Sequence, residues 1–415
     1  MKHLLVSLGV LAIAACTPAP PSTAPTPAVA SDSVTTSAQR AQYPSTYQRQ
    51  PSGTVLIKGG TVMTAAGDEI PNGSVLFQNG KLMAIGPTVA VPADAEVIDA
   101  TGKYVTPGLI DSHSHLGVYA APGTFGENDG NEATSPVTAE VWAEHSVWPQ
   151  DPQIPLAIAG GITVLQVLPG SANLIGGRAA TLRLIPARTV QEMKYPGAPY
   201  GMKMACGENP KRVYQSRGPS TRMGNMAGYR AAFIKAERYR RDWDKWNKEK
   251  KGDAPSRDLQ LETLSEVLRG NILVHNHCYR ADEMAQMLDL GKEFGFKIRS
   301  FHHVVEGYKI ADRLAAEGTA ASVWADWWGF KMEAFDGIPE NAALIQQAGA
   351  RTIIHSDSPD GIQRLNQEAA KAFYAGQHAG IKLTRVDAIR WITLNPAWAL
   401  GIYMEIGRAS CRERV

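Results

Sequence analysis

Hydrophobic and polar residues alternate along residues 51–105, and pairs such as Gly-Gly, Asn-Gly and Thr-Gly interrupt the alternation. An alternation with a period of two predicts strands that bury one face. The Asn-Gly pairs favour tight turns between neighbouring strands. Segments such as TVLIKGGTVMT and GSVLFQNGKLMAIGP therefore predict hairpins in a small β module.

From residue 106 to about residue 404 the pattern changes, and short apolar segments alternate with longer segments of helical periodicity. Examples of the apolar segments are GITVLQVLP, AATLRLIP, NILVHNH, FKIRSFHH and RTIIHSD. Alternating strands and helices predict a parallel sheet, and about eight such strands predict a closed (β/α)8 barrel. The predicted fold class is therefore α/β.

An insertion of about residues 209–270 separates two of the predicted barrel strands. Its centre, YRAAFIKAERYRRDWDKWNKEKKGD, combines many charges with aromatic residues such as Phe233 and Trp243. This pattern favours a solvated helix that packs one apolar stripe on its own domain. Contact with a membrane surface is the alternative.

The N-terminal segment MKHLLVSLGVLAIAAC has a basic start, a short apolar stretch and small residues before Cys16, which is typical of an export signal. Its end resembles a bacterial lipoprotein signal, so residues 1–16 are predicted to be a signal peptide with Cys16 as the lipidated residue. An ordinary cleaved signal is the alternative. Residues 17–50 are rich in Pro, Ala and Thr and predict a disordered tether. We expect a periplasmic protein that meets the membrane only through its lipid anchor.

Composition and net charge limit the classes of binding partner that we expect. The chain is 44% hydrophobic and 20% charged, and its formal net charge of +2 gives no reason to expect a nucleic acid. The last residues, 405–415 (EIGRASCRERV), break abruptly from the helical pattern before them. We expect this segment to be a non-native tail, with a genuine basic tail as the alternative.

Histidines gather at four places, each at the end of a predicted strand. In a barrel these strand ends meet at one face, where functional sites are built. Neutral imidazole nitrogens and carboxylate oxygens suit Zn²⁺, and they suit other divalent first-row metal ions less selectively. The sequence therefore predicts a metal site formed by a subset of His113, His115, His275, His277, His302, His303, His355 and Asp357.

The segment VTPGLIDSHSHLG resembles the first-strand signature of the amidohydrolase superfamily, most closely its imidazolonepropionase-like branch. The segments HSDSPD and DAIRWITLNPAWALGI are similar to later parts of the same pattern. The resemblance covers about residues 53–402 and implies a (β/α)8 barrel with a small N-terminal β-sandwich portion. In that family C-terminal strands complete the sandwich, and we expect those strands to be missing here.

The resemblance also implies that one or two divalent metal ions bind at the ends of several barrel strands. Zinc is the expected metal. Lys203 takes the place of a carboxylated lysine that bridges two ions, and Glu208 is its rival. His275 and His355 would support the ligands, while His302 would face away. The implied metal ligands are His113, His115, Lys203, His277, His303 and Asp357.

A metal ion that activates water, together with a base, suits hydrolysis of a C–N bond in an amide, dipeptide, N-acyl amino acid or cyclic amide. Asp357 is the expected base. A small-molecule amide or peptide-like compound is the expected partner, and a homo-oligomer remains open. The alternatives are a non-catalytic surface lipoprotein that uses the barrel to bind metal or ligand, and a metal-dependent deaminase.

Residues beside the predicted ligands are candidates for substrate binding and for covalent pairing. Tyr279 and Arg280 directly follow His277, and Arg222 follows the fourth strand, so these three are candidates for substrate contact. Cys206 and Cys278 are expected on neighbouring strands as buried free thiols. Pairing of these two cysteines in an oxidising compartment is the alternative.

Overall fold

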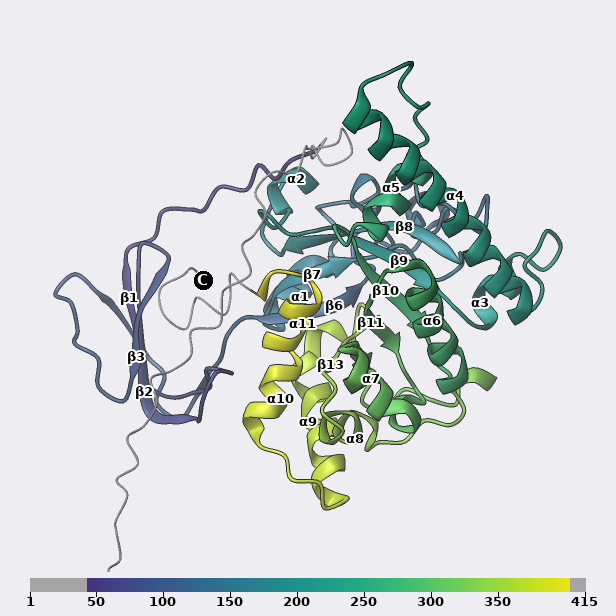
Figure 1. Ribbon diagram of the computed structural model, residues 1–415. Helices are drawn as coiled ribbons and strands as arrows, with labels where there is room; N and C mark the ends of the chain where they lie inside the picture. The colour runs from purple at the N-terminus through teal and green to yellow at the C-terminus, as the bar shows by residue number, and fades with distance from the viewer. Residues whose placement is uncertain (1–42, 404–415) are drawn as a thin grey trace, which may run out of the picture. The chain divides into compact units, whose positions relative to one another are not determined.

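The computed structural model of the protein describes residues 43–403 (Figure 1). The predicted signal peptide with Cys16, most of the predicted tether, and the predicted non-native tail of residues 405–415 lie outside the described residues. Residues 43–50, assigned to the end of the tether, include specific contacts: the backbone N–H of Thr46 donates to the carbonyl of Gln191 at 2.9 Å. Among the described residues, no helix combines the length and apolarity needed to cross a membrane.

The N-terminal β module is a five-stranded sheet with the order β3-β2-β1-β4, in which β5 also pairs with β1. The pair β1–β2 is antiparallel, and β4 runs parallel to β1. Asn79 and Gly80 form the predicted turn between β2 and β3, whereas Asn72 and Gly73 lie inside β2 opposite an irregularity in β1. The strands are β1 (Thr54–Val62), β2 (Ile70–Gln78), β3 (Lys81–Gly86), β4 (Glu96–Asp99) and β5 (Tyr104–Val105).

The second sheet has eight strands in sequence order from β6 to β13, which confirms the predicted α/β barrel. The loop after the last strand contacts the first strand: the backbone N–H of Asp357 donates to the carbonyl of His113 at 3.1 Å. The strands are β6 (Leu109–Ser114), β7 (Ile162–Val167), β8 (Ile175–Arg183), β9 (Gly201–Ala205), β10 (Leu273–Cys278), β11 (Ile298–His303), β12 (Ala320–Val323) and β13 (Thr352–Ile354).

One strand departs from the predicted parallel pattern. β8 is antiparallel to both β7 and β9. Only residues 168–174 connect β7 to β8, and a parallel crossover needs a dozen or more residues. The short connection therefore forces a hairpin at this place, and the other barrel pairs are parallel.

Helices follow most of the barrel strands and cover their outer faces (Figure 1). Their apolar residues join those of the strands in one large core, which includes Leu165, Met204 and Phe301. The helices are α1 (Gln153–Ala159), α2 (Val190–Met193), α3 (Glu208–Val213), α4 (Arg222–Glu249), α5 (Leu259–Leu268), α6 (Ala281–Phe294), α7 (Ala311–Glu317), α8 (Asn341–Gln347), α9 (Leu365–His378), α10 (Arg385–Trp391) and α11 (Leu394–Ala399).

The insertion contains α3, α4 and α5. In α4 the buried residues Tyr229, Ala232, Phe233 and Ala236 follow a helical spacing and form one stripe. Phe233 stacks on Phe296 with 4.5 Å between ring centroids. The helix thus packs on its own domain, as the sequence pattern favoured.

Candidate metal centre

The carboxyl ends of β6, β9, β10, β11 and β13 carry the predicted ligands, because parallel strands of a barrel end at the same face. His113 lies in β6 and His115 directly follows the strand, and their side chains point the same way because they are two residues apart. Their Nε2 atoms lie 3.3 Å apart. The sequence spacing that first suggested a shared ion therefore corresponds to a real convergence of two imidazoles.

Asp357 reaches this histidine pair from the loop after β13. Its Oδ1 lies 3.2 Å from His115 Nε2 and 3.4 Å from His113 Nε2. Lys203, on β9, places its Nζ 3.4 Å from His113 Nε2. Single ligand atoms of His113, His115 and Asp357 all lie within 4.8 Å of one another, which is close enough for one metal ion.

A second group lies against the first and shares one of its histidines. Ligand nitrogens of His113, His303 and His355 also lie within 4.8 Å of one another. The rings of His277 and His303 are 4.5 Å apart at their centroids, and His303 Nε2 is 3.9 Å from Asp357 Oδ2. His355, expected only to support the ligands, thus offers a nitrogen to the cluster.

Several of these buried nitrogens have no hydrogen-bond partner within the described part of the chain: Nδ1 of His277, Nδ1 of His303 and both ring nitrogens of His355. Buried polar atoms almost always have a partner, and each exception calls for an explanation. Imidazole nitrogens and a carboxylate are also the donor set that divalent transition-metal ions accept. The residues present therefore fit a divalent metal ion.

The expectation that His302 faces away from the ligands is wrong. Its Nδ1 lies 2.8 Å from Nδ1 of His113, and its Nε2 lies 3.0 Å from Nδ1 of His275. The alternation of a strand would point His303 outward instead, but φ is +76° at His303 and +47° at Val304. Because the backbone leaves the extended conformation there, two consecutive histidines contact His113.

Burial keeps the histidines in their neutral form. It lowers the pKa of His113, His277 and His303 well below the ordinary value, and nearby positive charges act in the same direction. Neutral imidazole is the form that binds a metal ion, because protonation occupies the donor lone pair. The cluster is thus ready to receive a cation at neutral pH.

The same surroundings also shift the pKa values of Lys203 and Asp357. Burial lowers the pKa of Lys203 to about 8, with only partial compensation by Asp357. Burial alone would raise the pKa of Asp357, but the hydrogen bond from His115 and the neighbouring positive charges hold it below the ordinary value. The aspartate is therefore ionised, and about one lysine side chain in ten is neutral at pH 7.

Asp111 belongs to the site although the motif analysis did not single it out. It is fully buried and accepts hydrogen bonds from the backbone N–H groups of His113 (3.1 Å) and Ser356 (3.2 Å) and from the Ser356 hydroxyl. Burial raises its pKa to about 7. Its place two residues before His113, within DSHSH, was the signal that the sequence offered.

Glu208, the rival of Lys203, lies elsewhere. It is the first residue of α3, and its Oε1 is 3.7 Å from Nζ of Lys331. The next residue, Asn209, is the one that reaches the cluster, with Nδ2 at 3.4 Å from Nε2 of His277. The structure thus brings Lys203, rather than Glu208, beside the histidines.

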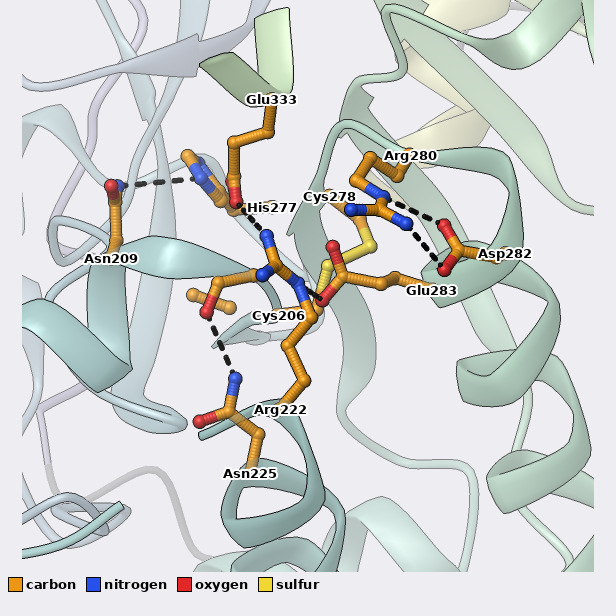
Figure 2. The surroundings of a disulfide bond; sticks show 12 residues. Cys206, Asn209, Arg222, Asn225, His277, Cys278, Arg280, Asp282, Glu283 and Glu333 are labelled. Carbon is orange, nitrogen blue, oxygen red and sulfur yellow. Dashed lines mark hydrogen bonds and ion pairs between the residues drawn. A yellow bond between two sulfur atoms is a disulfide. The ribbon is translucent and has the colours of Figure 1, made fainter. Parts of the chain in front are cut away.

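The candidate substrate contacts are of two kinds: two arginines that are already ion-paired (Figure 2) and one buried tyrosine. Arg222 forms ion pairs with Glu283 (2.9 Å) and Glu333 (3.3 Å), and Arg280 pairs with Asp282 at 2.9 Å. Both guanidinium groups are therefore held by carboxylates of the protein. Tyr279 is buried and stacks on His303, with centroids 5.2 Å apart, so it belongs to the wall of the cluster.

Cys206 and Cys278 form a disulfide, so the expectation of free thiols is wrong (Figure 2). Their Cα atoms are 5.3 Å apart, because Cys206 directly follows β9 and Cys278 ends the neighbouring strand β10. That spacing is typical of disulfides. The backbone N–H of Cys206 also donates to the carbonyl of His277 at 2.9 Å. The bridge thus ties together the two strands that carry Lys203 and His277.

Comparison with known proteins places this geometry in context. No protein-family model matches the chain. The solved structure of an amidohydrolase from Thermotoga maritima MSB8 is 35% identical, covers 84% of this chain and 89% of its own, and superposes with a TM-score of 0.77.

Two curated proteins are similar over different lengths. The amidohydrolase tasK of Hapsidospora irregularis is 34% identical over 363 residues, which is 81% of this chain and 36% of that relative. The chain therefore spans about a third of the length of that relative. An imidazolonepropionase from Geobacillus kaustophilus (strain HTA426) is 55% identical over 58 residues, or 12% of this chain.

Proposed function

Because this chain belongs to the amidohydrolase family, we propose that it hydrolyses a carbon–nitrogen bond of a small amide or peptide-like substrate with the help of one or two divalent metal ions. Zinc is the expected metal. The observation that carries the proposal is the convergence of buried neutral imidazoles on an ionised Asp357 at the carboxyl ends of the barrel strands.

Six residues would hold the metal. His113, His115 and Asp357 supply one set of donors. His303 belongs to the neighbouring set, and the ring of His277 lies 4.5 Å from it between centroids. Lys203 places its Nζ 3.4 Å from His113 Nε2, and a carboxylated side chain there would add oxygen donors to the cluster. Formation of that carbamate needs the neutral amine, and burial lowers the pKa of Lys203 to about 8. His355 is a further donor on the same face.

When bound, the metal supplies activation of water and polarisation of the substrate carbonyl. The protein supplies the base. The side chain of Asp357 is 23% exposed, against 1% for His113, so attacking water and substrate reach it from the open face. Since its pKa is held below the ordinary value, Asp357 is ready to accept a proton from the attacking water and deliver it to the leaving nitrogen.

The proposal also includes the branch of the family and the export of the protein. The imidazolonepropionase-like branch rests on the VTPGLIDSHSHLG signature and on a segment of 58 residues that is 55% identical to an imidazolonepropionase, while a segment of 63 residues is 51% identical to a D-hydantoinase. Export with lipidation of Cys16 is supported by the N-terminal sequence and by the Cys206–Cys278 disulfide. Disulfides persist in oxidising compartments such as the periplasm and are rare in the cytosol.

The test combines metal analysis with turnover. Metal content is measured by plasma mass spectrometry for the wild type and for His113→Ala, His277→Ala and Asp357→Ala, and each is assayed on an amide library in zinc-containing buffer. We expect loss of metal in the histidine variants and hydrolysis by the wild type alone. Full metal occupancy in the histidine variants would overturn the site. Bound zinc without hydrolysis by the wild type would favour a binding module. Release of ammonia from a ring amino group, with every amide left intact, would favour a deaminase.

A further inference from the structure

Three buried imidazoles lie behind the donor set of the candidate metal centre, inside the barrel. His113, His275 and His302 come from β6, β10 and β11, and none of them is more than 1% exposed. Bulky branched apolar side chains are the usual filling of such a barrel. Buried polar groups cost free energy unless they are hydrogen-bonded. Three imidazoles in this place therefore call for a role beyond filling space.

The three rings form one continuous imidazole chain. Nδ1 of His113 lies 2.8 Å from Nδ1 of His302, and Nε2 of His302 lies 3.0 Å from Nδ1 of His275. Burial lowers the pKa of each ring, so all three are neutral at neutral pH, and a neutral imidazole carries a single N–H. Each contact joins one N–H to one bare nitrogen. The direction of the first hydrogen bond therefore fixes the direction of the second, and two arrangements of the hydrogens satisfy both contacts.

The metal end of the imidazole chain distinguishes these two arrangements. Nε2 of His113 faces the first donor set, 3.3 Å from Nε2 of His115 and 3.4 Å from Oδ1 of Asp357. In one arrangement His113 donates from Nδ1 to His302, which leaves the lone pair of its Nε2 free for a cation. In the other arrangement His302 donates to His113, and the hydrogen on Nε2 of His113 occupies that lone pair. Only the first arrangement allows His113 to bind a metal ion through Nε2.

The deep end of the imidazole chain offers what the first arrangement needs. There His275 carries its hydrogen on Nε2, which requires an acceptor. Nε2 of His275 and Oε1 of Gln166 are both buried and have no hydrogen-bond partner within the described part of the chain. The two side chains meet beside Gly201, where an added Cβ would lie 3.0 Å from Nε2 of Gln166 and 3.0 Å from Cδ2 of His275. The Gln166 amide can therefore accept this N–H, directly or through one water molecule.

We propose that His302 and His275 are positioning residues that hold His113 in the tautomer with hydrogen on Nδ1, and thereby direct the lone pair of its Nε2 at the metal ion. This assignment rests on the proposed metal-dependent function. Both nitrogens of His302 are engaged in the imidazole chain, so it acts through His113 and not as a ligand. A ligand histidine that donates its other N–H to a fixed acceptor is oriented in advance and becomes more basic. A carboxylate or backbone carbonyl usually accepts that hydrogen, and here a second histidine takes its place.

The test compares two replacements of His302 in the full chain. His302→Leu removes the acceptor, whereas His302→Asn keeps an oxygen near the position of Nδ1. We expect His302→Leu to weaken zinc binding by about 10- to 100-fold, as loss of such a partner typically does. His302→Asn should stay within about threefold of the wild type, because His113 keeps an acceptor. Zinc titration against a chromophoric chelator measures the affinity, and the absorption spectrum of the cobalt-substituted protein reports the geometry around the ion.

A measurement on the wild type needs no replacement. With histidine labelled by a nitrogen isotope, NMR shows which ring nitrogen carries hydrogen. In the zinc-loaded protein we expect hydrogen on Nδ1 of His113 and on Nε2 of both His302 and His275. The control His145→Leu changes a histidine that stacks on Trp142 outside the cluster, and it should leave the zinc affinity unchanged.

These measurements separate the positioning role from the proposed function. Unchanged zinc affinity in His302→Leu would overturn the positioning role, as would an equal loss in a His302→Asn variant that unfolds like the wild type in urea. Hydrogen on Nδ1 of His302 in the zinc-loaded wild type would also overturn it. If the wild type binds zinc with the expected tautomers but hydrolyses no amide, the hydrolytic function fails and the positioning role stands. Amide hydrolysis by a wild type with the opposite tautomers would have the reverse meaning.

Discussion

The buried carboxylate of Asp111 accepts a hydrogen bond from the backbone N–H of Ser356 at 3.2 Å, across the gap between the first and last strands of the barrel. The same carboxylate accepts the N–H of His113 at 3.1 Å. One side chain thus fixes the relative position of a predicted metal ligand and of the loop that carries Asp357. This contact explains how residues more than two hundred positions apart form one site.

Replacement of Asp111 should loosen this connection. Asp111→Asn keeps the size of the side chain but replaces one acceptor oxygen with an NH2 group. That group would face the N–H and O–H donors of His113 and Ser356. We expect the free energy of unfolding to fall by about 1–3 kcal/mol, because a buried hydrogen-bonding group is left without a partner. Urea unfolding measures the loss, and metal content reports whether the site opens. Unchanged stability and metal content would show that the contact is dispensable.

Asp357 should be needed for proton transfer. Asp357→Asn cannot accept a proton, and we expect kcat/KM on the best amide substrate to fall by about 100-fold or more. The matched control is Asp360→Asn, which changes an exposed carboxyl three residues further along the same loop. Steady-state kinetics with parallel metal analysis separates a lost base from a lost ligand. Equal activity of the two variants would assign the base to another residue.

Lys203 and Glu208 can be distinguished by paired variants. Lys203→Met removes a side chain that lies 3.4 Å from His113 Nε2, whereas Glu208→Gln changes one that lies beside Lys331. We expect Lys203→Met to weaken metal binding by about 10- to 100-fold, as changes at metal sites typically do. Zinc titration against a chromophoric chelator measures the affinity. A greater loss in Glu208→Gln would reverse the assignment.

The Cys206–Cys278 disulfide should stabilise the ends of β9 and β10. It closes a separation of 72 residues, and removal of such a link costs about 2–4 kcal/mol of unfolding free energy. The Cys206→Ala/Cys278→Ala double variant should therefore unfold at lower urea concentration and bind zinc more weakly. Wild-type protein treated with reductant should behave like the double variant. A reductant effect of the same size in the double variant would point to another cause.

Stability of the metal-free protein should fall in acid. The pKa values of His113, His277, His302 and His303 are lowered well below the ordinary value, primarily by burial. Below about pH 6.5 these histidines bind protons in the unfolded chain but stay unprotonated in the folded chain. The free energy of unfolding therefore decreases as the pH falls. Each such histidine contributes up to about 1.4 kcal/mol per pH unit.

Urea unfolding in chelator at pH 5 to 8 measures this dependence. The variant His378→Ala changes an exposed histidine of α9 and should keep the same slope. Added zinc should raise stability at neutral pH, because binding to the folded state alone shifts the equilibrium. A flat pH profile for the metal-free wild type would contradict the buried neutral state of the histidines.

Local patterns were sufficient to predict much of this protein. Apolar segments separated by helical stretches predicted the barrel, because burial on both faces makes parallel strands uniformly apolar. The spacing of His113 and His115 predicted that they point the same way, because alternation is a property of the strand itself. The position of His277 and Asp357 after further apolar segments predicted that they meet these histidines at one face.

Tertiary structure decided the features that depend on contacts between distant segments. The direction of β8 follows from the short connection after β7, and the inward position of both His302 and His303 follows from left-handed backbone at the end of β11. The disulfide depends on the distance between two strand ends, and Asp111 acquires its role from Ser356. A sequence pattern carries the periodicity of one element, whereas these contacts depend on where the barrel closes, and so they require the folded chain.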